Sequence, residues 1–316
     1  MATRPEPTLI RPLRRHDVPN FLPLILQGIG EFERKTGLDR SAGEMVNMLS
    51  RRSIWFVLGI LRAFRRSPVE VFVAVDGSRF AGTGTLLFSR NTGYVAGMVT
   101  APECRGRGIA TRVLSVLQET SVRRKKPWLV LDVDSDNVGA SRVYERAGYR
   151  EVARTAFYTR TGLPPTGARK PPSPSSGREL EPLLTGLDSG REKDFRAAFP
   201  ATVRTLTHNE ILVSGRNTRK VTWVHGSAPS SPIVLRAVFS SASSLAVYFP
   251  LTGATPPTPG EVEGLFDGAT EWFRSSHPNS CLAVVAEPVG AVGSALEDLG
   301  FSRVVTSRTM LRSSAA

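Results

Sequence analysis

The chain is poor in the residues that build disulfide frameworks and metal centres. Its 316 residues include two cysteines and four histidines. These numbers exclude a disulfide scaffold and a cysteine-rich zinc site, and the histidines are too scattered for a metal cluster. No apolar run approaches the roughly 18 residues of a membrane-spanning helix. The first residues, MATRPEPTLIRPLRR, lack the apolar stretch of a secretory signal. We therefore expect a cytoplasmic protein with no bound metal and no transmembrane segment.

The composition that remains is that of a folded protein with an uneven charge. Hydrophobic residues make up 41% and charged residues 22% of the chain, and the net charge is +13. Residues 1–160 carry a net +11, whereas residues 178–316 are neutral. Whatever anion the protein binds, we expect the first half to bind it. Both a polyanionic cofactor and a nucleic acid fit this charge.

A proline-rich stretch divides the chain. Residues 161–182 contain six prolines separated by glycine, serine and threonine, a composition typical of an extended linker. The length of the chain fits about two domains. We therefore expect one domain over 1–160 and a second over 183–316.

Short strands and helices alternate in the first half, which predicts an α+β or mixed α/β fold with a mixed sheet flanked by helices. The Asp76-Gly77 pair between two apolar runs indicates a hairpin. The expected strands cover residues 8–11, 70–75, 80–88, 93–100, 128–133 and 149–158, and the expected helices cover 17–32, 41–64, 110–123 and 140–147.

One stretch carries a pattern associated with chemistry. Gly97 lies inside a strand, which suggests a bulge. The loop RGRGIA at 105–110 then opens a helix. Free N–H groups at a helix N-terminus, glycines that permit close approach and arginine charges together suit a pyrophosphate. The loop matches neither a P-loop nor a dinucleotide fingerprint, and the bare pattern also fits a solvated turn.

With its surroundings, this loop resembles a known motif. VTAPECRGRGIATRVL is similar to the acetyl-CoA-binding motif of the GCN5-related N-acetyltransferases (GNAT), through Arg105, Gly108 and Ala110. The downstream segment DNVGASRVYERAGYREV supplies the family's Asn137, Tyr144 and Gly148-Tyr149. The resemblance implies the GNAT acyl-CoA acyltransferase fold, in which two central parallel strands splay apart.

The resemblance also implies a cofactor site and a reaction. The acetyl group of acetyl-CoA would pass by direct attack to a primary amine of a small molecule or a protein. Residues ending the first splayed strand would offer backbone groups to the pantetheine arm and the thioester, the loop would hold the pyrophosphate, and a residue after the second strand would contact the cofactor. These residues are Met98, Val99 and Thr100 for the strand, Arg105, Gly106, Arg107, Gly108, Ile109, Ala110 and Thr111 for the loop, and Asn137.

Two side chains are candidates for proton transfer. By resemblance, the Tyr144 hydroxyl would protonate the leaving thiolate, although a helix tyrosine packed on the sheet is the alternative. Asp132 matches the carboxylate that ribosomal-protein alanine acetyltransferases use as a base. A solvated strand-end acid and a water-mediated path remain alternatives to it. Weaker candidates for the base are Glu103, Glu31, Glu33 and His16.

Two further features of the first half have plainer interpretations. Cys104 adjoins the loop, but direct transfer needs no thiol nucleophile, so a surface-turn cysteine is the favoured interpretation. The basic run 123–126 ends a helix and is typical of a solvated face, with an anionic partner as the alternative.

The second half resembles a degenerate copy of the first. A displacement of 152 places Gly148-Tyr149 on Gly300-Phe301 and repeats the order of strands and helices over 245–312. The loop arginines and glycines then fall on PTPG at 257–260, Asn137 on Val289 and Tyr144 on Leu296. Two of these residues are prolines, which lack an N–H group. We therefore expect a second GNAT-like domain without a cofactor site.

Two functions from different classes follow from the sequence. The first is an N-acetyltransferase with Tyr144 as general acid. The second is a non-catalytic acyl-CoA-binding or sensing protein that retains the loop. Nucleic-acid binding is disfavoured, since the basic half has no recognised module and no interleaved aromatic residues.

Overall fold

The computed structural model describes parts of both halves of the chain. The described residues are 8–28, 67–77, 79–88, 92–162, 218–225, 233–240, 245–251, 259–276, 282–288 and 293–314, together with positions 53, 55, 56 and 59. The expected helix 41–64 lies outside these residues except for the four single positions. The expected linker 161–182 lies outside them beyond its first two residues.

The chain divides into two compact units, and the division crosses the sequence twice. The first unit contains residues 1–151 and 309–316, and the second contains 152–308. Residues 152–160 thus group with the second unit, and the final eight residues group with the first. Neither grouping follows the expected boundaries at 160 and 183.

The first unit is built on a mixed sheet of strands in the order β1-β2-β3-β4-β5, followed by the end of β11. Neighbours from β1 to β4 pair antiparallel, whereas β4 and β5 pair parallel. The hairpin expected at Asp76-Gly77 is present, with Gly77 at a φ of +59°. The strands are β1 (Leu9–Pro12), β2 (Val69–Asp76), β3 (Arg79–Phe88), β4 (Thr92–Thr100), β5 (Trp128–Asp134) and β11 (Ser302–Ser313).

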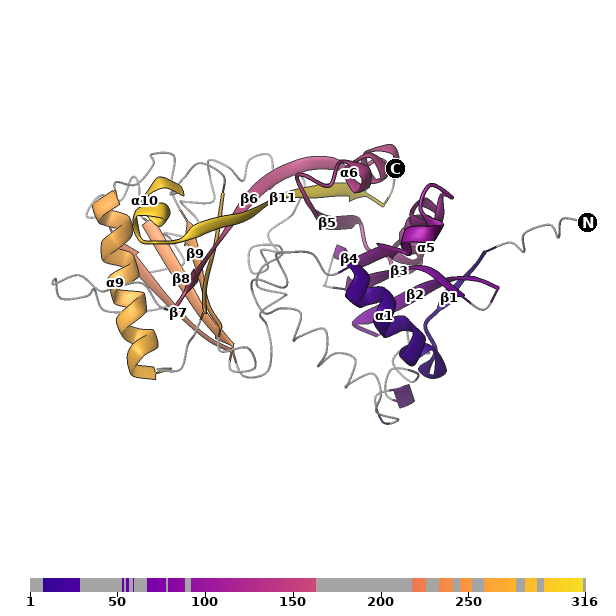
Figure 1. The fold of residues 1–316 in the computed structure, drawn as a ribbon, viewed down its shortest axis with the longest axis horizontal. Coiled ribbons are helices and arrows are strands. Elements are labelled where there is room, and N and C mark those ends of the chain that lie inside the picture. The colour runs from indigo at the N-terminus through magenta and orange to yellow at the C-terminus, as the bar shows by residue number, and fades with distance from the viewer. Residues whose placement is uncertain are drawn as a thin grey trace, which may run out of the picture. The chain divides into compact units, whose positions relative to one another are not determined.

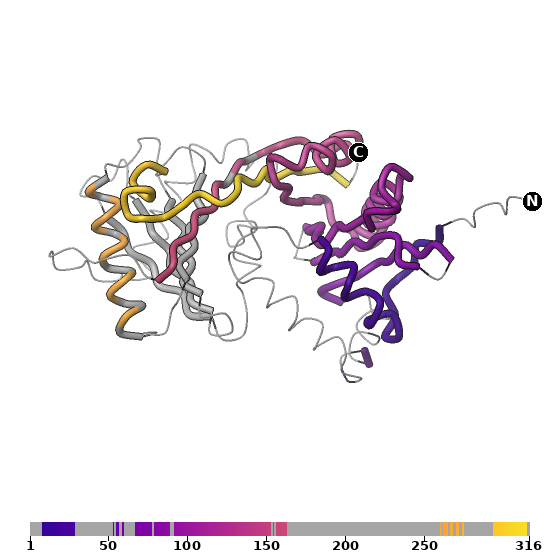
Figure 2. The backbone as a smooth tube through the Cα atoms, in the orientation of Figure 1, coloured from indigo at the N-terminus to yellow at the C-terminus, as the bar shows by residue number. Residues whose placement is uncertain are grey.

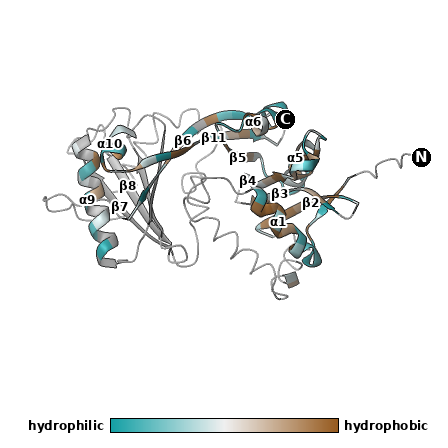
Figure 3. Ribbon diagram, viewed as in Figure 1, coloured by the Kyte–Doolittle hydropathy of each residue, from teal (hydrophilic) through white to brown (hydrophobic). Residues whose placement is uncertain are grey.

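Helices α1 (Val18–Gly28) and α5 (Ile109–Arg123) lie against this sheet (Figure 1). Two hydrophobic clusters hold them there. Helix α5 buries Val113, Leu114 and Leu117 in the larger cluster, while α1 buries Phe21 and Ile25 in the smaller one. Figure 3 shows α1 largely in the colour of hydrophobic residues. The remaining helices are short: η1 (Arg15–Asp17), η2 (Pro102–Cys104) and α6 (Val138–Arg146).

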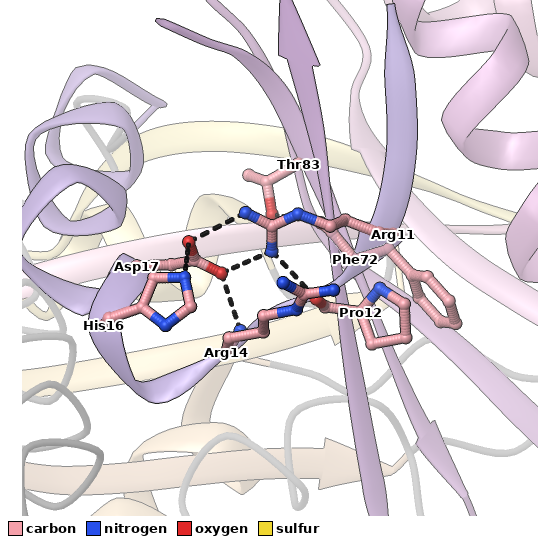
Figure 4. Close-up of polar contacts among 7 residues, drawn as sticks. All are labelled: Arg11, Pro12, Arg14, His16, Asp17, Phe72 and Thr83. Carbon is pink, nitrogen blue, oxygen red and sulfur yellow. Dashed lines mark hydrogen bonds and ion pairs between the residues drawn. The ribbon is translucent and has the colours of Figure 1, made fainter. Parts of the chain in front are cut away.

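A buried ion pair fixes the entry to α1 (Figure 4). The guanidinium of Arg11 on β1 contacts both carboxylate oxygens of Asp17, at 2.5 and 2.9 Å, and the backbone N–H of Arg14 donates to the same carboxylate at 2.7 Å. The hydrogen bond from Arg11 is the main cause that lowers the pKa of Asp17. Since Asp17 is 3% exposed, these donors replace the water that a carboxylate would otherwise need.

Each half of the sequence contributes part of a strand to the unit that is built mainly from the other half. Strand β6 (Arg150–Thr161) follows α6 but pairs antiparallel with β10 (Leu282–Pro288). Strand β11 is the neighbour of both β6 and β5. Figure 2 shows β6 and β11 running side by side, in magenta and yellow. The last strand of the chain therefore completes the sheet of the first unit.

Among the described elements of the second unit, β7 to α10 repeat the order of strands and α-helices from β2 to α6 of the first. Its sheet runs β11-β6-β10-β9-β8-β7, and β9 and β10 pair parallel, as β4 and β5 do. Its other elements are β7 (Thr218–His225), β8 (Ile233–Ser240), β9 (Leu245–Leu251), α9 (Pro259–Ser276) and α10 (Gly293–Asp298).

The turn after α10 reproduces the turn after α6. Gly148 and Gly300 have φ values of +86° and +80°. Tyr149 N–H donates to the Tyr144 carbonyl at 3.0 Å, and Phe301 N–H donates to the Leu296 carbonyl at 2.9 Å. All these positions are related by the displacement of 152 that the sequence comparison found.

Candidate active site

The site begins where β4 and β5 separate. Their parallel pairing runs from Thr92↔Trp128 to Val95↔Leu131 and ends there. Beyond Val95, β4 continues to Thr100 with β3 as its neighbour among the described strands. Its other edge therefore offers backbone N–H and C=O groups to an extended ligand, as in strand addition.

A bulge in β4 lies at this separation. The β3–β4 register changes from Thr85↔Ala96 to Thr83↔Val99, which leaves one extra residue on β4. Gly97 has a φ of +56°, a conformation that glycine adopts without a steric penalty. The bulge expected at Gly97 is confirmed, and it lies just beyond Val95, where the pairing of β4 with β5 ends.

Helix α1 packs closely on the same end of β4. A Cβ at Gly28 would lie 2.2 Å from Val99 Cγ2, and a Cβ at Gly97 would lie 3.9 Å from Ile25 Cδ1. Since Gly28 has no side chain, the end of α1 reaches the Val99 side chain. Val99 is thus held from α1 while its backbone lies on the open strand.

The turn after β4 exposes a run of backbone N–H groups. Gly106 and Gly108 have φ values of +74° and +75°, and a Cβ on either would meet nothing within 4 Å. Helix α5 begins at Ile109, and within the part of the chain that is described no backbone carbonyl accepts from the N–H groups of residues 106–111. The turn and the helix N-terminus together suit a phosphate.

The two loop arginines differ in their surroundings. Arg105 is exposed and, among the described residues, forms no ion pair. Arg107 Nη2 lies 2.8 Å from Asp76 Oδ2 at the β2–β3 hairpin, and its Nη1 lies 3.9 Å from Cys104 Sγ. The sequence did not predict this ion pair, which ties the loop to the hairpin.

Asp132 is the first residue of β5 beyond the paired region, and it lies in a small hydroxyl network. Tyr94 Oη donates to Asp132 Oδ2 at 3.3 Å, and Thr309 Oγ1 donates to Asp132 Oδ1 at 2.5 Å. The side chain is partly buried. Burial first, and then the nearby Asp132 charge, raise the pKa of Tyr94 well above its usual value, so this phenol stays protonated.

Tyr144 lies on α6 in the larger hydrophobic cluster, with its ring edge against Tyr149 at a centroid distance of 6.0 Å. It is 7% exposed, and burial raises its pKa to about 12. The Tyr144 phenol is also one of the smaller causes that raise the pKa of Tyr94. Within the described residues, no hydrogen bond to the Tyr144 hydroxyl is formed.

Asn137 has a structural task at the start of α6. Its Oδ1 accepts the Ala140 N–H at 3.0 Å, and its carbonyl accepts the Ser141 N–H. It is therefore the N-cap of α6. Since the residue is exposed, its side-chain NH₂ group remains able to donate to a ligand.

Two interpretations from the sequence need correction. Cys104 is 6% exposed and belongs to the core, because η2 turns it inward; it is not a surface-turn cysteine. Within the basic run 123–126, Arg124 is not on a solvated face. Its guanidinium lies over the Phe88 ring at 4.5 Å, is 3.3 Å from Glu70 and donates to the Ser67 carbonyl.

The weaker candidates for a base lie apart from this network or outside the description. Glu103 is exposed on η2. His16 is exposed and lies 3.4 Å from Asp17. Glu31 and Glu33 lie outside the described residues. In the described ranges, no group of three or more His, Cys, Asp or Glu side chains could hold a metal ion, and no helix is long and apolar enough to cross a membrane.

Comparisons with known proteins agree with this geometry. The profile of the Acetyltransferase (GNAT) family matches residues 42–149. N-alpha-acetyltransferase 30 of Schizosaccharomyces pombe is 33% identical over 104 residues, which cover 30% of this chain and 67% of that protein. The fold and the relative define an acyltransferase enzyme. The chain belongs to the GNAT acetyltransferase family.

Two solved structures share the fold over almost the whole chain. A tandem GNAT protein from the clavulanic acid biosynthesis pathway has a TM-score of 0.53 and 16% identity, with 98% of this chain and 99% of that chain covered. A GCN5-related N-acetyltransferase from Sphaerobacter thermophilus has a TM-score of 0.55 and 14% identity, with 99% and 97% covered. At these identities the likeness concerns the fold alone.

Proposed function

We propose that the protein transfers the acetyl group of acetyl-CoA to a primary amine. The observation that carries the proposal is the combination of the open β4 edge with the N–H-rich turn before α5. The backbone of Met98, Val99 and Thr100 would pair with the pantetheine arm. The turn from Arg105 to Thr111 would bind the pyrophosphate, and the Asn137 NH₂ group would add a contact.

The proposed chemistry is a direct attack by the neutral amine on the thioester carbonyl. The amine nitrogen forms the new C–N bond and gives up a proton, the carbonyl carbon loses its bond to sulfur, and the thiolate leaves. Asp132 would accept the proton, directly or through one water, because a carboxylate has acceptor sites beyond the two that Tyr94 and Thr309 occupy. Backbone N–H groups of β4 would stabilise the oxyanion.

Tyr144 would donate the proton that the leaving thiolate takes. Its pKa of about 12 keeps the phenol protonated at neutral pH. Its hydroxyl has no hydrogen-bonding partner among the described residues, so it is available as a donor. A buried, protonated phenol near the site is what a general acid for a thiolate requires.

We further propose the α-amine of a peptide as the acceptor to test first. An α-amine has a pKa of about 8, against about 10.4 for a lysine side chain. A much larger fraction of it is therefore neutral at pH 7, which suits a site whose base is a carboxylate. The name of the S. pombe relative points the same way.

For the second unit we propose a degenerate GNAT-like domain without a cofactor site. By the displacement of 152, the fully buried Leu296 corresponds to Tyr144, and the proline at the start of α9, Pro259, corresponds to Arg107 of the loop. Val289, the counterpart of Asn137, lies outside the described residues. The role of this unit would be structural, since it carries β11 into the first sheet.

The test is acetyl transfer to a peptide panel that varies the first two residues, with N-terminally blocked peptides containing lysine as controls. Mass spectrometry locates the acetyl group, and thiol release gives the rate. We expect acetylation of the free α-amine. Binding of acetyl-CoA without transfer to any peptide or small amine would instead favour an acyl-CoA-binding protein.

A further inference from the structure

The C-terminal strand places a hydroxyl group on the candidate base. Thr309 lies on β11, which enters the first unit from the opposite half of the sequence. Its Oγ1 donates to Asp132 Oδ1 at 2.5 Å, and the two residues are 177 positions apart. Without this strand, that carboxylate oxygen would lose the Thr309 hydroxyl as a donor.

The position of Thr309 is fixed by the residues that follow it along the strand. Met310 and Leu311 are 0% and 1% exposed, and Met310 belongs to the larger hydrophobic cluster. Farther along, the Ser314 N–H donates to the Pro127 carbonyl at 2.9 Å, just before β5. Burial of these neighbours holds Thr309 in register with Asp132, so its hydroxyl is not a chance surface contact.

We infer that Thr309 is a positioning residue for catalysis: it orients the Asp132 carboxylate toward the acceptor amine and stabilises its charged form. This inference rests on the proposed role of Asp132 as the base. A hydrogen bond to the charged form of an acid favours that form. Because Tyr94 holds the other oxygen, the carboxylate is fixed from β4 and from β11 at once.

Phenols and a further carboxylate are the titratable groups near Asp132. Tyr94 on β4 and Tyr144 on α6 are phenols whose pKa values lie above the usual one. Asp134, two residues along β5, shares the face of Asp132 by strand alternation and is exposed. Arg308 flanks Thr309 on β11, where alternation directs it to the opposite face. An acidic limb of the rate profile can therefore be traced to a carboxylate by mutation.

The experiment measures kcat/KM against pH for acetyl transfer to the best peptide of the panel. Thr309→Val removes the hydroxyl with little change in shape. We expect the midpoint of the acidic limb to move upward by about half to one pH unit, the equivalent of one lost hydrogen bond. Thr309→Ser should restore the wild-type midpoint. Acetyl-CoA affinity, measured by calorimetry, should stay within about twofold of the wild type.

Matched variants separate this inference from a structural effect. Thr306→Val makes the same change three residues earlier on β11 and should leave the midpoint in place; an equal shift would overturn the inference. If Thr309→Val is poorly folded, Thr309→Ala supplies the same comparison.

Asp132→Asn distinguishes the two possible failures. If it abolishes the limb while the Thr309 variants keep the wild-type midpoint, the role of Thr309 is refuted and the base assignment stands. If the limb persists in Asp132→Asn, the base assignment fails, and the role of Thr309 fails with it.

Discussion

The guanidinium of Arg107 lies 2.8 Å from the carboxylate of Asp76, so the candidate pyrophosphate loop is tied to the β2–β3 hairpin. Arg105, two residues earlier, has no such partner among the described residues. The two arginines should therefore contribute to cofactor binding in different ways. Arg105 would act as a charge toward the anion, and Arg107 would also hold the loop in place.

Reversing either charge should weaken acetyl-CoA binding. We expect Arg105→Glu and Arg107→Glu to raise Kd at least about tenfold, because a like charge would face the pyrophosphate. Asp76→Asn keeps both cations and should change Kd far less. Calorimetry at two salt concentrations measures these values. An unchanged Kd in Arg105→Glu and Arg107→Glu alike would remove the pyrophosphate from this loop.

The C-terminal strand should stabilise the first unit. Met310 is fully buried beside Leu131 and Tyr144 in one cluster, and Met310→Ala should cost about 2–5 kcal/mol. Hydrogen exchange should show faster exchange over β5, while β8 of the second unit stays protected. Ser302→Ala, at an exposed position of the same strand, is the control. Unchanged protection of β5 in Met310→Ala would contradict the exchange of strands.

The Arg11–Asp17 pair should make the free energy of unfolding depend on pH in the acidic range. The pKa of Asp17 is lowered in the folded state, chiefly by the hydrogen bond from Arg11. Its contribution is therefore complete above the unfolded pKa of about 3.9 and is lost as the pH falls through the folded value. Asp17→Asn should lower the free energy of unfolding at pH 7 by about 1.5–3 kcal/mol.

The same variant should differ less from the wild type at low pH. Urea unfolding at pH 7 and near pH 3 gives the two differences. If the deficit of Asp17→Asn is as large near pH 3 as at pH 7, the carboxylate is not the source of the stabilisation.

Short-range features of the structure could be predicted from the neighbouring residues in the sequence. The strands around β2, β3 and β4, the hairpin at Asp76-Gly77, the bulge at Gly97 and the glycine that ends α6 were each predicted within a few residues. Apolar alternation and glycine positions determine such features over short ranges, and the sequence alone contains that information.

The contacts between residues that lie far apart in the sequence could not be predicted. The patterns of β6 and β11 predict strands, but alternation does not say which strand each will pair with. The contacts Arg107–Asp76 and Thr309–Asp132 join residues that no spacing rule connects. Cys104 was misplaced for a related reason: a turn pattern indicates exposure, whereas the short helix η2 directs this side chain into the core.

The most direct test of the proposed reaction is the turnover number of Tyr144→Phe with acetyl-CoA and the best peptide. The substitution keeps the buried ring and removes the hydroxyl that would protonate the thiolate. We predict that kcat falls by about 10²–10⁴-fold while the Kd for acetyl-CoA stays unchanged. A kcat equal to that of the wild type, with single-turnover measurements showing that chemistry limits the rate, would contradict the account.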